Sequence, residues 1–210
     1  MSATRRAATL PVSFFDRSAA TVARDLLGTI VVSRVGGTRT AGVIVETEAY
    51  LGHDDPASHG YLHRRNERNA ALFGPPASWY VYLSYGMHWC ANLVCEAEGR
   101  ASAVLLRALE PLEGLATMRR RRGGVDDRLL CAGPGRLCQA LGITRALDGG
   151  HMPHSPVAVV EPGPESTRPA IAATPRVGIT KAAEWPLRFV VEDSVYLSRR
   201  PPGKPKPPGG

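Results

Sequence analysis

Lysine is scarce in this sequence, which has three lysines against 23 arginines. Two of the three stand within the last seven residues, so Lys181 is the one lysine in the body of the chain. Chemistry through a Schiff base requires an amine nucleophile. Such a mechanism would have to rely on Lys181 alone, and we do not expect it.

Cysteine is also rare, and the four examples are Cys90, Cys95, Cys131 and Cys138. They form no CxxC pair and show no spacing typical of a zinc site. Free cysteine usually behaves as a small apolar residue. We therefore expect four buried cysteines that hold no metal.

No continuous apolar run approaches the roughly 20 residues that a membrane-spanning helix needs. The uncharged stretch 69–95 is interrupted by Pro75, Pro76 and three tyrosines. Arg5 and Arg6 precede no apolar segment of the kind found in secretory signals. We expect a soluble, cytoplasmic protein, and the preference for arginine over lysine favours a bacterial source.

Several common catalytic motifs are absent as well. The sequence contains no Walker loop, no GxGxxG, no GxSxG and no HExxH. The sequence therefore lacks the residues that are typical of phosphate-loop, dinucleotide-binding, serine-hydrolase and zinc-peptidase proteins.

The length of 210 residues and a hydrophobic content of 43% suit one domain with a substantial core. Six of the 26 basic residues fall at the two ends, so the remainder is almost neutral despite a formal charge of +7. We expect a flexible N-terminus at 1–9, a folded domain at 10–198 and a disordered basic tail at 199–210, rich in proline and glycine. The arginine clusters in 64–68 and 119–122 are candidate nucleic-acid contacts, with a solvated surface as the equal alternative.

Hydrophobic periodicity predicts one helix over residues 13–28, closed by Gly28. Alternation predicts a hairpin of strands 29–33 and 40–50, and a second of strands 79–83 and 89–95 around a turn at 85–88. Further predicted elements are short helices at 68–73, 113–122 and 134–141, and strands at 102–109, 156–160, 176–179 and 187–191. Together they predict a single mixed α+β domain with a largely antiparallel β-sheet and surrounding helices.

The segment VIVETEAY, residues 43–50, carries the first candidate chemistry. A period of two places Ile44, Glu46, Glu48 and Tyr50 on one face of a strand. If that face lines a cleft, burial raises a carboxylate pKa and provides a general base. If it is solvated, the pattern is ordinary surface alternation. The local pattern leaves Glu46 and Glu48 open as alternatives.

Two histidines offer a metal-site alternative. His59 and His63 would share one face of a helix, and acidic residues lie nearby. Gly60 and the polar context make a helix unfavourable there, so we do not expect a metal.

Aromatic residues are concentrated in one short stretch. Six of the 13 aromatics lie within residues 73–89, around the turn of the second predicted hairpin. A tip that carries Tyr85, Met87 and His88 exposes apolar surface that a monomer normally buries. Proteins that distort DNA insert such wedges between base steps. The hairpin is therefore a candidate DNA-intercalating element.

Longer motifs now make the sequence recognisable. They are VETEAYLG (45–52), His59, RNERNAALFG (65–74), YVYLSYGMHWCANLV (80–94), VLLRALEPLEG (104–114), GPGRLCQALGI (133–143) and RVGI (176–179). Together they resemble the 3-methyladenine DNA glycosylases of the alkyladenine (methylpurine) type. The similarity runs from about residue 14 to residue 196.

The resemblance implies an enzyme of base excision repair that acts as a monomer on double-stranded DNA, near the bacterial nucleoid, without cofactor or metal. It implies release of alkylated or deaminated purines, namely 3-methyladenine and 7-methylguanine, with hypoxanthine and ethenoadenine as further candidates. Glu48 matches the general base of the family, and Arg107 and the carbonyl of Val177 match groups that hold the attacking water.

The resemblance also assigns the pocket and the wedge. Tyr50, His59 and Tyr82 match the side chains that sandwich the extruded base, and Asn92 matches a residue that crowds the 2-amino group of guanine. The residues that match the intercalating hairpin are Tyr85, Met87 and His88.

Three residues depart from the family pattern. Leu72 stands where methionine is usual, Ala77 where glycine is usual, and Ser84 where a large aliphatic residue is usual.

Two other functions remain as alternatives. The first alternative is a non-catalytic module that binds damaged DNA through the hairpin. The second is a metal-dependent hydrolase built on His59, His63 and nearby acids.

Overall fold

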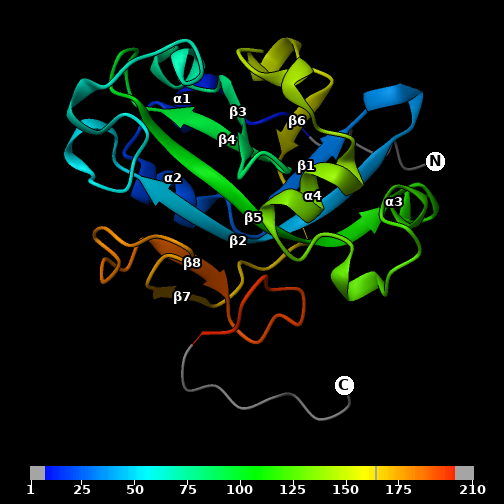
Figure 1. Cartoon of the computed structure of the whole chain (residues 1–210). Helices are drawn as coiled ribbons and strands as arrows, with labels where there is room; N and C mark the ends of the chain where they lie inside the picture. The colour runs from blue at the N-terminus through cyan, green and yellow to red at the C-terminus, as the bar shows by residue number, and fades with distance from the viewer. Residues whose placement is uncertain (1–7, 164, 202–210) are drawn as a thin grey trace.

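The computed structural model describes residues 8–163 and 165–201, and within them the chain forms one mixed α+β domain (Figure 1). Of the predicted flexible N-terminus (1–9) and disordered tail (199–210), residues 1–7 and 202–210 lie outside the described residues. The helices are α1 (Val12–Phe15), α2 (Ala19–Asp25), α3 (Leu115–Arg121) and α4 (Pro134–Leu141). The strands are β1 (Ile30–Ser33), β2 (Thr40–Tyr50), β3 (Trp79–Ser84), β4 (His88–Cys95), β5 (Ser102–Glu113), β6 (Val157–Val160), β7 (Ile171–Thr174) and β8 (Arg188–Val191).

The strands form an eight-stranded sheet in the order β3-β4-β5-β2-β1-β6, and β8 joins β2 to β7. Every strand pairing among the described residues is antiparallel. The predicted fold class is therefore confirmed, and β1 pairs with β2 and β3 with β4. None of the helices in this described part has the length and apolar character required to cross a membrane.

Side chains of alternating direction give the two faces of β3, β4 and β5 different surroundings. Val81, Ala91 and Leu106 belong to the main hydrophobic core, together with the buried residues of α2 and α4. The intervening positions, among them Tyr82 and Asn92, point to the other face and line a cavity. The core side thus supports the strands, and the opposite side is left for a site.

The prediction of a single helix over residues 13–28 is wrong. The chain breaks after Phe15, and a second helix begins at Ala19. Ser18 caps α2, since its hydroxyl accepts the backbone N–H of Thr21 at 3.3 Å. Serine offers the backbone this alternative bond, so it ends one helical path and begins another.

The predicted strand at 176–179 is also wrong, because the strand lies earlier, at Ile171–Thr174. Residues 176–179 turn across the sheet instead. Arg176 is buried against Asp55, and Gly178 has a φ of +77°, which a strand does not accommodate. This turn places Val177 beside Glu48.

A β-bulge separates Ile44 from the acidic residues that follow it. In the β2–β5 ladder Ile44 faces Leu109 and Glu46 faces Ala108, so Val45 is extra. Ile44 consequently packs in the main core, and the prediction that it shares a face with Glu46 is wrong. The register is restored at once by Arg107, an extra residue on β5. Bulges commonly re-aim side chains next to active sites.

The four cysteines are buried and free, as expected. Burial raises the pKa of the Cys131 thiol to about 12, which keeps it in the unreactive thiol form. The cysteines therefore serve as small apolar side chains.

Candidate active site

One row of residues crosses four strands and forms the floor of the site. The pairings Tyr80–Asn92, Asn92–Leu105 and Leu105–Glu48 connect β3, β4, β5 and β2 in that order. With neighbouring strands about 4.8 Å apart, this row spans roughly 14 Å. Because the residues are in register, their side chains share one face of the sheet. The antiparallel ladder thereby gathers residues that are up to 57 positions apart in the sequence.

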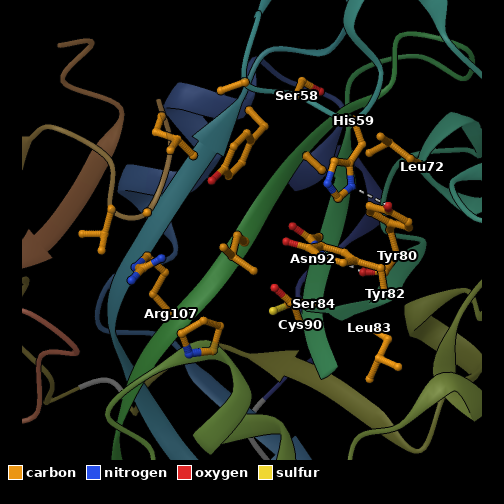
Figure 2. Close-up of a pocket in the computed structure, with 18 of the residues that line it drawn as sticks. Ser58, His59, Leu72, Tyr80, Tyr82, Leu83, Ser84, Cys90, Asn92 and Arg107 are labelled. Carbon is orange, nitrogen blue, oxygen red and sulfur yellow. Dashed lines mark hydrogen bonds between the residues drawn. The ribbon is translucent and has the colours of Figure 1, made fainter. Parts of the chain in front are cut away.

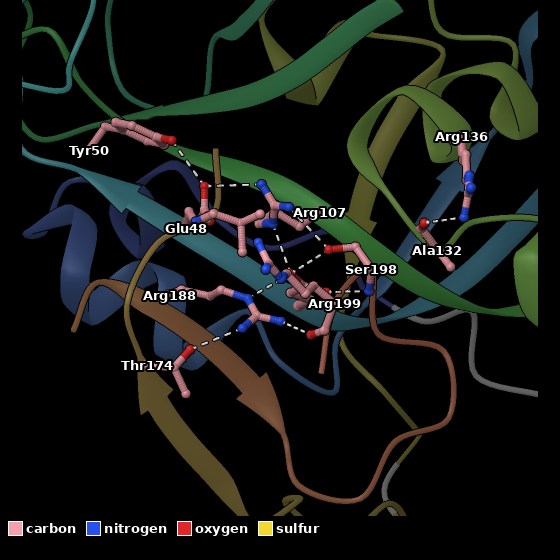
Figure 3. A network of polar contacts seen from close by, with 11 residues as sticks. Glu48, Tyr50, Arg107, Ala132, Arg136, Thr174, Arg188, Ser198 and Arg199 are labelled. Carbon is pink, nitrogen blue, oxygen red and sulfur yellow. Dashed lines mark hydrogen bonds and ion pairs between the residues drawn. The ribbon is translucent and has the colours of Figure 1, made fainter. Parts of the chain in front are cut away.

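Glu48 is fully buried and accepts three hydrogen bonds (Figure 3). Its Oε1 accepts the backbone N–H of Val177 at 2.6 Å. Its Oε2 accepts the hydroxyl of Tyr50 at 3.0 Å and Nη1 of Arg107 at 3.2 Å. The three groups that hold Glu48 belong to residues that line the adjacent cavity. The carboxylate thus lies directly behind the cavity wall.

Glu46 is equally buried but has different partners. Its Oε1 accepts Nε of Arg107 and Nε of Arg188, both at 2.8 Å, and the hydroxyl of Ser198 at 2.7 Å. Its Oε2 accepts the backbone N–H of Ser198 at 2.6 Å. Four donors surround the carboxylate, so it has the contacts of a permanent anion.

The two carboxylates have pKa values displaced in opposite directions. Burial raises the pKa of Glu48, and the opposing effects of Arg107, the N–H of Val177 and the Tyr50 hydroxyl do not cancel that rise. Burial by itself also raises the pKa of Glu46, but Arg107 and Arg188 outweigh it and bring the pKa below its ordinary value. Such divergence is the usual mark of two carboxylates with separate tasks. The sequence pattern alone could not separate them.

A cavity of about 520 Å³ opens over the row, within the size range of ligand pockets (Figure 2). Its lining includes every residue that the sequence predicted for the base pocket: Tyr50, His59, Tyr82 and Asn92. Arg107 and Val177, two of the three predicted catalytic residues, also line it, and Glu48 lies behind them.

An aromatic wall forms one side of the cavity. The rings of His59 and Tyr82 meet edge to face with centroids 4.6 Å apart, and Tyr80 stacks on Tyr82 at 5.4 Å. His59 Nδ1 lies 2.7 Å from the Tyr80 hydroxyl, as the dashed line in Figure 2 shows. Burial lowers the pKa of His59, so the ring is neutral at neutral pH. His59 and Tyr82 therefore act as one wall, and Tyr50 stands on the other side of the row, on β2.

Asn92 lies in the floor between these walls. Its side chain is buried, and its Nδ2 donates to the backbone carbonyl of Tyr80 at 3.0 Å. That bond fixes the orientation of the amide. The side chain is therefore a rigid part of the cavity floor.

Arg176 is a site residue that the sequence reasoning missed. It is fully buried and makes a two-bond ion pair with Asp55, at 2.5 and 2.9 Å, and it donates to the carbonyl of Ala49 at 3.0 Å. Its guanidinium also lies 4.7 Å from the centre of the Tyr50 ring. It belongs to the RVGI motif, and its charge was the signal that could have identified it. Arg188 and Ser198 were missed as well: Arg188 lies in a strand that the sequence predicted without assigning it a function, and Ser198 follows in a segment without a distinctive pattern.

The hairpin tip is exposed. Tyr85 is 87% accessible and Met87 is 71% accessible. Tyr85 also has a φ of +49°, a region that bulky residues seldom adopt. His88 begins β4 opposite Ser84, and its side chain lies against Gly135 at the start of α4. The first two predicted wedge residues thus project freely, and the third lies at the base of the turn.

The departures from the family pattern have clear positions. Leu72 and Ser84 line the cavity. Ala77 is buried with a φ of +66°, a conformation that glycine adopts without strain. The usual glycine at that position is thereby explained by backbone geometry.

The two arginine clusters differ in their contacts. Arg119 pairs with Asp127, Arg121 donates to the carbonyls of Ala140 and Val35, and Arg122 donates to the carbonyl of Leu130. This cluster holds α3 in place.

In the other cluster, Arg64 and Arg68 are exposed. Within residues 8–163 and 165–201, their side chains have no hydrogen bond or ion pair. These two arginines are free to contact an anion.

The described residues contain no group of three or more histidine, cysteine or acidic side chains arranged to hold a metal. His59 bonds to Tyr80, whereas His63 stacks on His53 with ring centres 4.3 Å apart. His59 and His63 therefore have separate partners, and residues 61–63 form a single short turn in place of the helix that the metal-site alternative would require.

Comparison with known proteins gives one consistent result. The sequence model of the methylpurine-DNA glycosylase family matches residues 13–195. A relative from Rhodopseudomonas palustris is 53% identical over 186 residues, covering 89% of this chain and 86% of its own. One from Rhizobium meliloti is 53% identical over 193 residues, covering 91% and 97%. One from Methanoculleus marisnigri is 50% identical over 194 residues, covering 91% and 100%. Each is named "Putative 3-methyladenine DNA glycosylase".

Proposed function

Because the chain belongs to the methylpurine-DNA glycosylase family, we propose that it extrudes alkylated purines from double-stranded DNA and hydrolyses their N-glycosidic bond with a water activated by Glu48. Membership makes it a DNA glycosylase, a hydrolase of N-glycosyl bonds in DNA repair. The proposal concerns its substrates, its chemistry and the residues that perform it.

The observation that carries the proposal is the contrast between Glu46 and Glu48. A general base works best when its pKa lies near the working pH. Glu48 has the raised pKa and touches three cavity-lining groups, whereas Glu46 has a lowered pKa and touches one lining residue, Arg107. Glu48 is therefore the base, and Glu46 supports Arg107.

The aromatic surroundings suit a flipped purine. Extruding a nucleotide costs a few kcal/mol, and damage that weakens pairing lowers the cost. A base that enters between Tyr50 and the His59–Tyr82 wall gains stacking on both faces. 3-Methyladenine and 7-methylguanine carry a positive charge, and a cation over an aromatic ring gains about 0.5–2 kcal/mol. The pocket thus favours alkylated purines by charge as well as by shape.

Asn92 supplies a negative selection. Its amide is fixed by the bond to the Tyr80 carbonyl, so it cannot rotate freely to make room. The 2-amino group of normal guanine would meet this rigid side chain. Adenine derivatives lack that group and fit without the conflict. 7-Methylguanine keeps the group, so its entry depends on the positive charge that stacking favours.

The reaction needs a water next to the anomeric carbon. Glu48 is fully buried, so the water reaches it by inserting between the carboxylate and the groups that now touch it, Tyr50 or Arg107. Glu48 takes a proton from this water as the water oxygen attacks C1′. The purine leaves with the electrons of the glycosidic bond. The developing positive charge on the sugar resembles that of other glycosyl transfers. The carbonyl of Val177 accepts the second hydrogen of the water.

The hairpin tip completes the proposal. Tyr85 fills the gap that the extruded base leaves, with Met87 and His88 beside it against the neighbouring bases. Aromatic and apolar side chains occupy this place in proteins that unstack DNA. The unpaired Arg64 and Arg68 contact phosphates close to the cavity.

The decisive experiment is single-turnover release of free base from duplex DNA that contains 7-methylguanine or 3-methyladenine. Wild type and Glu48→Gln are compared in buffer with EDTA, and both are tested for binding to an abasic-site mimic. We expect release by wild type alone, with binding retained in the variant. Duplexes with hypoxanthine and ethenoadenine then define the lesion range.

Three outcomes would contradict the proposal in whole or in part. Binding to distorted DNA without release by wild type would indicate a damage-binding module. Release that EDTA abolishes and a divalent metal restores would indicate a metal-dependent hydrolase. Equal release by both proteins would remove Glu48 from the chemistry.

A further inference from the structure

A segment that follows β8 lies under the candidate active site. We call residues 196–199 the C-terminal strap. It follows β8 and returns to β2 and β5, where Ser198 contacts Glu46 and Arg107 (Figure 3). The carbonyl of Arg199 accepts a hydrogen bond from Arg188, which attaches the strap at a second point. The strap is thus part of the buried charge network.

Ser198 uses its backbone N–H and its hydroxyl in this network. Its backbone N–H donates to Glu46 Oε2 at 2.6 Å, and its hydroxyl donates to Glu46 Oε1 at 2.7 Å. A hydroxyl that donates once keeps lone pairs for acceptance. Ser198 Oγ therefore accepts Nη2 of Arg107 at 3.1 Å. The Ser198 hydroxyl thus donates to the Glu46 carboxylate and accepts from the Arg107 guanidinium.

These contacts determine the direction of the Arg107 guanidinium. A guanidinium is planar, so fixing two of its nitrogens fixes the third. Nε is bonded to Glu46 and Nη2 to Ser198, and the remaining Nη1 is directed at Glu48, 3.2 Å away. Without the Ser198 hydroxyl, Arg107 would keep its bond to Glu46 and the longer bond to Glu48, but it would lose the contact that holds Nη2.

We propose that Ser198 is a positioning residue for base excision, which acts through Arg107 on Glu48 and does not touch the substrate. The inference rests on the proposed role of Glu48. Ser198 is not among the residues that line the cavity, so its effect must pass through Arg107. The strap thereby makes the C-terminal end of the domain a component of the active site.

The test compares Ser198→Ala and Ser198→Thr with wild type in the full chain. Alanine removes the hydroxyl but keeps the backbone N–H bond to Glu46, and threonine restores the hydroxyl. The matched control is Ser194→Ala, the same change four residues earlier, where the hydroxyl accepts the N–H of Tyr196 at 3.3 Å. Single-turnover release of 7-methylguanine is measured from pH 5 to pH 9, with binding to an abasic-site mimic and thermal melting.

The pH profile separates positioning from simple structural support. The groups that face Glu48 are Arg107, Tyr50, the N–H of Val177 and the charge of Glu46. Arg107 lowers the pKa of Glu48, so an Arg107 that is directed less firmly at Glu48 leaves that pKa higher. The acid limb of the profile, where Glu48 becomes protonated, then moves to higher pH.

For Ser198→Ala we expect release at neutral pH to slow by about five-fold or more, as loss of one hydrogen bond to a charged group would predict. We also expect an acid limb at higher pH and binding within about two-fold of wild type. Threonine restores the wild-type profile, and Ser194→Ala matches it.

An unchanged rate and profile in Ser198→Ala would overturn the inference. So would a slower reaction with an unmoved acid limb, since that is the result of structural damage alone. Failure of wild type to release any methylated base would instead refute the proposed function, so the two failures are distinguishable.

Discussion

Glu46 and Glu48 stand two residues apart on β2, both fully buried and both bonded to the same arginine, Arg107. Their surroundings nevertheless separate them. Glu46 has two guanidinium groups and the strap, which keep it ionised, while Glu48 has one guanidinium and lies against the cavity wall. One strand thus supplies a fixed anion and a titratable base from adjacent positions on one face. The fixed anion orients the cation that in turn contacts the base.

Glu46→Gln should destabilise the protein strongly. The amide nitrogen would face the Ser198 N–H, a donor, and the charge that balances Arg107 and Arg188 would be lost. Removing one member of a buried charge network typically costs roughly 3–5 kcal/mol. Urea denaturation at pH 7 measures this loss. Glu113→Gln is the control, since Glu113 pairs with Arg39 on the surface, where such pairs contribute about 1 kcal/mol or less. Equal effects of the two substitutions would contradict the assigned role of Glu46.

Glu48 should affect stability in the opposite sense from Glu46, because its ionised form opposes folding. The pKa of Glu48 is higher in the folded protein than in the unfolded chain, so its ionised form opposes folding at pH values above the folded pKa. As the pH falls through that pKa, the carboxylate of Glu48 takes up a proton and its destabilising effect is lost. We therefore expect the free energy of unfolding of wild type, relative to Glu48→Gln, to increase as the pH is lowered from 8 towards 4.5. Denaturation series across that range test the sign, and a difference that does not vary with pH would show that Glu48 is not strained by burial.

The sequence predicted the elements whose signals are local, and it failed where distant groups decide. Alternation alone located β2, β3 and β4, because each side chain there faces a core or a cavity. The bulge at Val45 was not predictable, since it depends on the register with β5. The strand wrongly expected at 176–179 is prevented by the pairing of Arg176 with Asp55, 121 residues away. Ser198 lies 152 residues from Glu46, and no local pattern connects them.

The resemblance supplied the site residues that local pattern could not. Alternation put Glu46 and Glu48 on one face but gave no reason to prefer either. The structure adds that reason through the unequal number of arginines around them. Tyr50, Tyr82 and Asn92 line one cavity because the ladder brings β2, β3 and β4 together, a relation that the register determines. His59 joins them from the loop after β2, through its contact with the Tyr80 hydroxyl.

Cationic and neutral lesions should differ in their pH dependence. An alkylated purine is already positively charged and leaves without further protonation, so its release requires only that Glu48 be ionised. Release therefore falls at low pH, below the raised pKa of Glu48, and stays level above it. Hypoxanthine is neutral and needs a proton to leave, so its release should also fall at high pH and give a bell-shaped profile. Single-turnover rates on the two substrates provide the comparison. Bell-shaped pH profiles that coincide for both substrates would show that protonation of the leaving purine does not distinguish them.

Tyr85→Ala should impair excision without affecting stability. The Tyr85 side chain is almost fully exposed, and exposed substitutions usually change stability by about 0.5 kcal/mol or less. Loss of the wedge should let the extruded nucleotide return to the stack, so the release rate falls while the melting temperature stays constant. Leu112→Ala serves as the control because Leu112 is also exposed, but on β5 outside the cavity lining. Equal release rates for the two variants would contradict the role of the hairpin tip.

The pair Asp55–Arg176 should be coupled in both stability and activity. Each side chain is fully buried, and Arg176 also supports the Tyr50 ring, so either single change leaves an unpaired buried charge. Asp55→Asn and Arg176→Met should each cost roughly 3–5 kcal/mol, and the double variant should cost less than the sum. In the double variant the charge imbalance is removed, but Tyr50 still lacks its support. Stability should therefore recover further than excision of 7-methylguanine does. Full recovery of both would show that Arg176 balances Asp55 and contributes nothing to the position of Tyr50.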